Sequence, residues 1–213
     1  MQKILADGVL FVCSANVCRS PMMQFAYQQT LGDSLSAWPV VSRGVRVMEA
    51  MPICSVVAEM LPDAPTAAHS SRQVSERVVG RAALVIATTT AESAVLAQVS
   101  PEARHRTFTF QQALSLAARP ATDDEIERAR AGLAHGSQPL VEIVHLLNRR
   151  RGTESEMPKR SGLRIGVPFS DSDNFFDVHG DRNSRHRKAL KTLRKDVEDF
   201  ATHMRHLARA MGA

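Results

Sequence analysis

Short, wholly apolar runs alternate along this chain with longer segments whose apolar residues recur at helical spacing. Residues 8–12 and 83–87 form continuous apolar runs typical of strands buried on both faces, and residues 39–42 and 107–110 form two shorter strand-like segments. The intervening segments are predicted to be helical: residues 21–32, 52–61, a short helix capped by Ser75, 91–99 and 111–118. This alternation predicts an α/β fold, a three-layer sandwich in which helices cover both faces of a central four-stranded parallel sheet, as in flavodoxin-like or Rossmann-like proteins.

The second half of the sequence is predicted to be mainly helical. Thr122 and Glu125 have the spacing of a capping box, residues 139–148 form a further helix, and the polar residues 152–162 form a loop. The final helix carries one apolar stripe at spacings of three and four residues, made of Leu190, Leu193, Val197, Phe200, Met204, Leu207 and Met211. This stripe predicts packing against the sheet, with a coiled-coil seam as the alternative. Without a repeat or a second domain, all 213 residues are expected to form a single domain.

The composition is that of an ordinary folded protein, with 44% hydrophobic and 23% charged residues. The net charge of +5 is accompanied by one tryptophan and one tyrosine, too few aromatic rings for nucleic-acid stacking platforms. The charge therefore indicates a solvated surface with a bias toward anionic substrates, and no nucleic-acid partner is expected.

The cysteine content and the apolar runs bear on the cellular compartment. Three cysteines, an odd number without the His/Cys spacing of metal sites, argue against a disulfide framework and against a zinc site. No apolar run reaches the length of a membrane span, and the first one, at residues 9–12, is too short for a secretory signal. A reducing cytoplasm is the expected location.

The candidate chemistry lies at the end of the first strand, in the sequence Cys13-Ser14-Ala15-Asn16-Val17-Cys18-Arg19-Ser20-Pro21. Ser20 and Pro21 have the pattern of an N-cap followed by proline at the first helical position. A short loop between a strand and a helix N-terminus directs backbone N–H groups inward, and the helix dipole adds positive potential. Arg19 supplies a planar guanidinium that bonds two phosphate oxygens at once. The segment is therefore predicted to hold a tetrahedral phosphate dianion.

Cys13 is the candidate nucleophile of this loop. Helix N-termini and nearby cations favour thiolates, so the sulfur is expected to be ionised at neutral pH without an adjacent histidine base. The Ser20 hydroxyl is a candidate donor to the sulfur when the sulfur leaves. The alternative for Cys13 is a small buried hydrophobe at a strand end. The apolar strand before the loop and the Ser-Pro helix start after it favour the nucleophile.

The loop resembles the signature Cys-x-x-Asn-x-Cys-Arg-Ser-Pro of the low-molecular-weight protein tyrosine phosphatase family. Further matches to the family are Ser-Arg-Gly at residues 42–44 and His-Ser-Ser-Arg-Gln-Val at residues 69–74. The similarity runs from residue 8 to residue 110 and resumes near residue 177. The segment at about 119–165 is extra length relative to the family pattern.

The resemblance implies roles for individual residues. It makes Cys13 the nucleophile, and it assigns phosphate binding to Arg19 and to the other residues of the loop: Ser14, Ala15, Asn16, Val17, Cys18 and Ser20. Asn16 and Ser20, together with Ser42 and His69, are implied to form the network that supports the loop. The alternative for His69 is a hydrogen-bonded histidine without a functional role. In the family the counterpart of Cys18 forms a reversible protective disulfide with the nucleophile, and the alternative is a buried structural cysteine.

The general acid of the family is an aspartate followed by proline, on a loop before the final helix. The matching aspartate is Asp177, but Val178 stands where the family has proline. Because proline restricts its own backbone and that of the residue before it, this replacement predicts a more mobile acid loop and a lower turnover. Asp171, Asp173 and Asp181 are the neighbouring alternatives for the acid.

These observations predict a cysteine-dependent phosphatase. Its expected substrate is phosphotyrosine, in a protein or as a small aryl phosphate, which reacts through a phosphocysteine and releases inorganic phosphate. The mechanism requires no metal and no other cofactor. Three alternatives remain: a non-catalytic phosphate-binding adaptor; an arsenate reductase, which would need further cysteines near residues 83–90; and a protein-arginine phosphatase, whose relatives carry threonine where Val17 stands.

Overall fold

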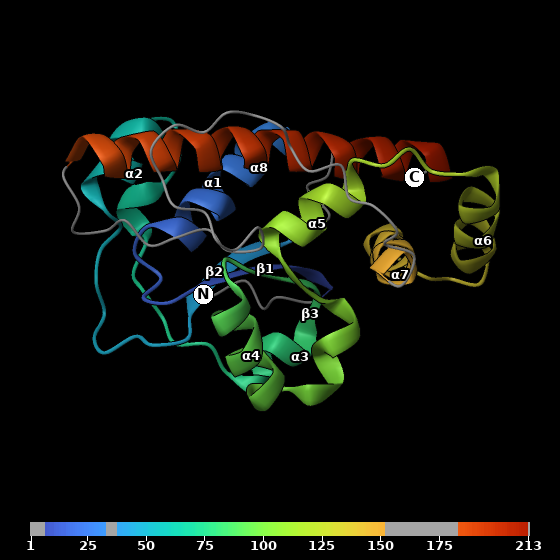
Figure 1. The fold of residues 1–213 in the computed structure, drawn as a ribbon, viewed down its shortest axis with the longest axis horizontal. Coiled ribbons are helices and arrows are strands. Elements are labelled where there is room, and N and C mark those ends of the chain that lie inside the picture. Colours follow the sequence, from blue (N-terminus) through green and yellow to red (C-terminus); the bar gives the residue numbers. More distant parts are fainter. Residues whose placement is uncertain (1–6, 33–37, 152–182, 213) are drawn as a thin grey trace.

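The computed structural model describes residues 7–32, 38–151 and 183–212. Its sheet consists of four parallel strands in the order β2-β1-β3-β4. The strands are β1 (Gly8–Cys13), β2 (Val40–Gly44), β3 (Ala82–Ala87) and β4 (Thr107–Thr109). Helices lie on both faces of this sheet (Figure 1), which confirms the predicted three-layer α/β sandwich.

The helices follow the strands in the alternation that the sequence predicts. They are α1 (Arg19–Leu31), α2 (Ser55–Met60), α3 (Glu76–Arg81), α4 (Thr90–Val99), α5 (Phe110–Ala117), α6 (Asp123–Ala134), α7 (Pro139–Arg150) and α8 (Asn183–Met211), with 3-10 turns at Thr66–Ala68 and Pro101–Arg106. Helices α1, α5 and α8 cover one face of the sheet, and α3 and α4 cover the other (Figure 1).

Every residue of β1 and β3 is buried, because these are the two central strands and both of their faces are covered. The larger core cluster lies between the sheet and α1, α5, α7 and α8, and a smaller one lies under α3 and α4. Aromatic rings form the centre of the larger cluster: Tyr27 contacts Phe11 and Phe200 at centroid distances of 5.5 and 5.8 Å, and Phe200 contacts Phe110 at 6.0 Å.

The predicted apolar stripe of the last helix is confirmed. All seven of its residues, from Leu190 to Met211, are buried in the larger core cluster. Helix α8 runs along α1 and across the whole face of the molecule (Figure 1). Among the described residues, none of the helices has both the length and the apolar composition that a membrane crossing requires.

The predicted extra segment contributes two helices to the main core. Thr122 and Glu125 form the expected capping box at the start of α6. The apolar face of α7, from Leu140 to Leu147, joins the larger core cluster. Arg150, at the end of α7, is 3% exposed and donates to the Glu125 carboxylate and to the carbonyls of Leu116, Arg119 and Pro120. Arg150 therefore connects the start of α6 to the end of α5 through hydrogen bonds.

Several element boundaries differ from the sequence-based expectation, and hydrogen bonds of a side chain or backbone group account for three of them. The residue at the N-cap of α1 is Cys18, and the hydroxyl of Ser20 bonds inside the loop instead of capping the helix. Helix α2 begins at Ser55 because the backbone N–H of Cys54 donates to the Val17 carbonyl. Strand β4 stops at Thr109 because the Thr109 side chain caps α5.

Candidate active site

The loop between β1 and α1 lies at the carboxyl end of β1, where the strand order changes direction between β1 and β3. Ligands of open α/β sheets bind at such a switch point. Cys13 ends β1 and is 2% exposed, while Ala15 is exposed and Ser14 and Val17 are half-buried. The residues predicted to bind phosphate follow Cys13 directly, in the loop and in the first turn of α1.

Two groups lie within hydrogen-bond distance of the Cys13 sulfur. The backbone N–H of Asn16 donates to Sγ at 3.2 Å, and the Ser20 hydroxyl lies 3.1 Å from Sγ. The hydroxyl also accepts from the Asn16 side chain, and its single proton has a second acceptor in the Arg43 carbonyl. The Ser20 hydroxyl can therefore donate either to the Cys13 sulfur or to the Arg43 carbonyl, whereas the Asn16 N–H donates to the sulfur.

Asn16 holds the loop together. Its backbone is left-handed, with φ 57°, a conformation that asparagine adopts more readily than most residues. Its side-chain amide donates to the hydroxyls of Ser20 and Ser42, both at 2.9 Å, and its side-chain oxygen accepts from the backbone N–H of Arg72 at 3.0 Å. All the polar atoms of a fully buried side chain are thus paired.

The predicted supporting residues Ser42 and His69 both contact Asn16. Ser42, on β2, accepts from the Asn16 amide and donates to Gln24 at 2.7 Å, so Gln24 orients it. His69 Nε2 lies 2.9 Å from the Asn16 carbonyl and must donate to it, because a carbonyl oxygen only accepts. Burial, and to a smaller extent Arg43 and Arg72, lowers the pKa of His69, although its bond to Asn16 opposes this. The neutral imidazole is therefore favoured, with its proton on Nε2.

The head group of Arg19 is fixed by two residues that sequence reasoning did not find. Its Nη1 donates to the Thr88 hydroxyl at 2.9 Å and lies 3.4 Å from Oε1 of Glu92. Oε2 of Glu92 accepts from the hydroxyls of Thr88 at 2.6 Å and Thr89 at 2.8 Å. Their position in the sequence could have indicated this role, because they directly follow β3. Strands β1 and β3 are parallel neighbours, so their carboxyl ends lie at the same edge of the sheet.

Gly44 allows the loop to lie against β2. A Cβ at this position would come within 2.5 Å of the Ser14 carbonyl oxygen and 2.6 Å of the Val47 side chain. The backbone N–H groups that follow it bond to the loop: Val45 donates to the Cys13 carbonyl and Arg46 to the Ser14 carbonyl. Glycine is thus required here by close approach of two backbones.

The predicted general acid Asp177 lies outside the described residues, as do its alternatives Asp171, Asp173 and Asp181 and the neighbouring Val178.

The three cysteines are not joined by disulfides. Cys54 is buried at the N-cap of α2, next to Cys18. A hydrogen bond from the Cys18 side chain, together with the backbone N–H groups of Val57 and Val56, lowers the pKa of Cys54 to about 5 against the opposing effect of burial. These contacts favour the thiolate form of Cys54.

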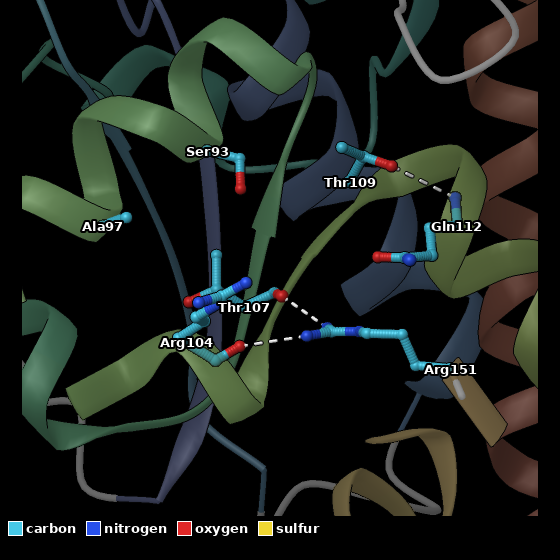
Figure 2. A pocket seen from close by; sticks show the side chains of 7 residues that line it. All are labelled: Ser93, Ala97, Arg104, Thr107, Thr109, Gln112 and Arg151. Carbon is cyan, nitrogen blue, oxygen red and sulfur yellow. Dashed lines mark hydrogen bonds between the residues drawn. The ribbon is translucent and has the colours of Figure 1, made fainter. Parts of the chain in front are cut away.

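A separate cavity of about 180 Å³ lies between α4, β4 and α5 (Figure 2). Arg151 forms one side of it, donates to the carbonyls of Thr107 and Arg104, and stacks on Phe108 with its guanidinium carbon 3.9 Å from the ring centroid. No residue of the loop from Cys13 to Ser20 lines this cavity, so it is not part of the candidate site.

A buried cysteine and a fixed arginine on a strand-loop-helix turn, at the switch point of a parallel sheet, are the features of cysteine-dependent phosphatases. Residues 8–132 match the family described as "Low molecular weight phosphotyrosine protein phosphatase". The chain belongs to this family and is a phosphatase of the low-molecular-weight type, as the resemblance of its loop predicted.

The relatives include enzymes with two kinds of substrate in their names. A protein-arginine-phosphatase of Geobacillus stearothermophilus is 34% identical over 109 residues, which are 50% of this chain and 71% of the relative. The low molecular weight phosphotyrosine phosphatase of Vibrio cholerae O395 has a similar structure, with a TM-score of 0.60 and 16% identity, over 98% of this chain and 100% of that one. Wzb of Vibrio vulnificus, in complex with benzylphosphonate, has a TM-score of 0.57 and 16% identity, over 92% and 97% of the two chains. At these identities the structural matches establish the fold.

Proposed function

We propose that this chain hydrolyses phosphotyrosine or a small aryl phosphate through a phosphocysteine on Cys13. The single observation that carries the proposal is the environment of the Cys13 sulfur: one backbone N–H and one hydroxyl reach it, and the buried guanidinium of Arg19 is fixed in the same turn. This environment favours a thiolate and a bound anion at one place.

In the first step, the Cys13 sulfur attacks phosphorus in line with the departing aryl oxygen. Arg19 and the backbone N–H groups of residues 14–20 stabilise the equatorial oxygens of the transition state. Asp177 protonates the departing oxygen. In the second step, Asp177 takes a proton from the water that attacks the phosphocysteine, and the Ser20 hydroxyl donates to the departing sulfur. Inorganic phosphate is the product.

The supporting residues Asn16, Ser20, Ser42 and His69 hold the nucleophile and the phosphate-binding N–H groups in fixed relative positions. Asn16 connects the loop to Ser20, Ser42 and His69, so its side chain fixes the distance between β2 and the turn that carries Cys13. Prearranged donors need no reorganisation when the charge develops, which is the main source of their catalytic effect. We assign these residues a positioning role and assign contact with the substrate to Cys13, Arg19 and the loop amides.

An aryl substrate is favoured by Val17. It is half-buried on the loop beside the nucleophile, where related arginine phosphatases carry threonine. An apolar side chain favours an aromatic ring over a polar guanidino group, which would leave its N–H groups without partners. A nucleophilic thiolate also functions best in a reducing compartment, so we place the reaction in the cytoplasm.

A second candidate, a protein-arginine phosphatase, is favoured by the curated relative with 34% identity. The two candidates share Cys13 and Arg19 and differ in the leaving group. Their kcat/KM values on a phosphotyrosine peptide and on a phosphoarginine peptide of the same sequence discriminate them. We expect the phosphotyrosine peptide to be preferred, and Val17→Thr to shift the ratio toward phosphoarginine. A preference of the wild type for phosphoarginine would select the second candidate.

The test of the catalytic assignment is Cys13→Ser. This variant is expected to lose hydrolysis of an aryl phosphate while it still binds inorganic phosphate, because the loop donors and Arg19 remain. Wild-type protein is expected to be most active on the acidic side of neutral pH, since Asp177 must be protonated while Cys13 is ionised. Phosphate binding without turnover in the wild type would favour the adaptor, and activity that keeps rising above about pH 8 would contradict the acid assignment.

A further inference from the structure

Cys18, Cys54 and His186 come together where α1, α2 and α8 meet, although they are far apart in the sequence. Cys18 is the N-cap of α1, Cys54 is the N-cap of α2, and His186 lies near the start of α8. The two sulfur atoms and a ring nitrogen of the histidine lie within 4.8 Å of one another. The three side chains are 6%, 8% and 5% exposed, respectively. The proposed phosphatase mechanism uses neither Cys54 nor His186.

Several contacts fix the three backbones relative to one another. The backbone N–H of Cys54 donates to the Val17 carbonyl at 2.9 Å, which joins the start of α2 to the phosphate loop. Arg187, next to His186, pairs with Glu59 of α2 at 2.6 Å. Two turns further along α8, Arg194 donates to the Met60 carbonyl, also at 2.6 Å. The cluster is therefore held by contacts of the surrounding elements and does not depend on the three side chains alone.

Two cysteine sulfurs and one imidazole nitrogen are a preferred ligand set of Zn²⁺. With metal–ligand bonds of about 2.0–2.3 Å, ligand atoms of a tetrahedral zinc site lie roughly 3.5–3.8 Å apart, so closure around the ion needs movements of about 1 Å or less. The charge of the ion also balances two thiolates at a position where burial disfavours unpaired charge. We infer that Cys18, Cys54 and His186 bind one Zn²⁺ ion, with a water molecule as the fourth ligand.

This inference departs from the sequence-based expectation that the protein binds no metal. Zinc motifs are usually recognised by two close pairs of ligands, whereas these ligands are single residues at positions 18, 54 and 186. The inference is independent of the proposed phosphatase reaction, since Cys13 is not a ligand. Bound zinc would connect the start of α1, next to Arg19, to α2 and α8, and would thus stabilise the fold around the phosphate loop.

The test is zinc binding by the full chain after treatment with a chelator. Competition with a chromophoric zinc chelator should give one Zn²⁺ per chain, and Co²⁺ should produce the near-ultraviolet thiolate-to-cobalt charge-transfer band. Cys54→Ser and His186→Gln are each expected to lower the zinc affinity by about 100-fold or more, because each removes one of three protein ligands. Unchanged affinity in either variant, or less than one binding site per chain in the wild type, would overturn the inference.

Two control variants test the location of the ion. Cys13→Ser should bind zinc as the wild type does, and loss of binding in this variant would place the metal on the nucleophile instead. His145→Gln removes a half-exposed histidine on α7 that pairs with Glu142, and it should also bind zinc normally.

A measurement on the wild type alone covers the case in which a ligand variant does not fold. Zinc-edge X-ray absorption of the zinc-loaded protein should give two sulfur neighbours and at least one nitrogen neighbour. A shell of only oxygen and nitrogen would contradict the site. Zinc should also raise the Tm of the wild type, and no rise at zinc concentrations well above the measured Kd would exclude binding to the folded state.

Discussion

Nη1 of Arg19 lies 3.4 Å from Oε1 of Glu92, and the two side chains are 7% and 6% exposed. Thr88 connects them a second time, since its hydroxyl accepts from Arg19 and donates to Glu92. The Arg19 guanidinium, which is proposed to bind phosphate, is thus positioned by the buried carboxylate of Glu92 on α4. Because a buried ion pair is strongly weakened when one charge is removed, Glu92 should control how Arg19 is presented to the substrate.

Glu92→Gln is expected to lower kcat/KM for an aryl phosphate by about 10- to 100-fold, because a misplaced guanidinium stabilises the transition state less well. The amide keeps the shape and one acceptor but removes the charge. The effect should fall mainly on kcat, with a smaller change in the inhibition constant of inorganic phosphate, as expected of a positioning residue. Glu76→Gln, at an exposed carboxylate in the first turn of α3, is the matched control. Equal kcat/KM values for the Glu92 variant and the wild type would refute the role.

Asn16→Gly tests the loop network separately from the backbone conformation. Glycine accepts the positive φ of this position, so the variant removes only the side chain and its three hydrogen bonds. The free energy of unfolding is expected to fall by about 2–4 kcal/mol, because buried partners are left without a bond. Denaturant unfolding at neutral pH measures it. kcat/KM is expected to fall with it.

The matched control for Asn16→Gly is Asp7→Gly. Asp7 is the other non-glycine residue with positive φ among the described residues, at 55°, but its side chain is exposed. Its replacement should leave the free energy of unfolding within about 0.5 kcal/mol of the wild type or raise it slightly. A similar loss in both variants would mean that the network around Asn16 contributes little.

Gly44→Ala is expected to impair the phosphate loop with little effect elsewhere. The added Cβ would lie 2.5 Å from the Ser14 carbonyl oxygen and 3.0 Å from the Ala15 carbonyl carbon, so the loop backbone must move. A displacement of this size near the reacting atoms lowers kcat/KM by about 100-fold. Steady-state kinetics on an aryl phosphate and phosphate-inhibition constants measure the effect, and both should worsen.

Gly80→Ala gives the control for Gly44→Ala, since an added Cβ there meets nothing within 4 Å and the residue lies in α3. Alanine at this helical position should stabilise the protein by about 0.5–1 kcal/mol and leave kcat/KM unchanged. If Gly44→Ala leaves kcat/KM unchanged as Gly80→Ala does, the close approach of β2 to the loop does not contribute to catalysis.

The sequence was sufficient to predict the sheet, the order of helices and the loop, because these depend on local periodicity and on a contiguous motif. The residues from Cys13 to Ser20 are adjacent in the chain, and the two supporting residues Ser42 and His69 were reached through the family resemblance. Their contacts with Asn16 place them where the resemblance implied. Glu92 carries no local signal of this kind, since a glutamate near a helix start is also a common helix-stabilising feature.

Tertiary partners explain what the sequence did not reveal. Ser20 has the sequence pattern of an N-cap, yet its hydroxyl has partners in Asn16 and Cys13 that only the folded loop provides. The cluster of Cys18, Cys54 and His186 is likewise a product of helix packing. Spacing rules detect ligands that share one element and therefore cannot detect this cluster.

The ion pair between Glu125 and Arg150 predicts how stability depends on pH. Arg150 lowers the pKa of Glu125 from 4.5 to about 2, with a smaller contribution from the backbone N–H of Thr122 and against the opposing effect of burial. A carboxyl group whose pKa is lower in the folded state stabilises that state above its unfolded pKa. The contribution is therefore complete above pH 4.5 and is lost as the pH falls toward about 2.

Glu125→Gln removes the charge and keeps the shape of the side chain. At pH 7 the variant is expected to be less stable than the wild type by about 1–2 kcal/mol, a value reduced by solvent screening of a partly exposed group. The difference should shrink as the pH is lowered from 4.5 toward about 2, because Glu125 of the unfolded wild type takes up a proton in this range before the folded protein does. Urea unfolding of both proteins at several pH values measures the difference.

Glu127→Gln, at an exposed position of the same helix, is the control and should show no pH-dependent difference in the free energy of unfolding. A gap for Glu125→Gln that stays constant into the acid range would mean that Arg150 is held by the carbonyls of Leu116, Arg119 and Pro120 and gains little from the charge of Glu125.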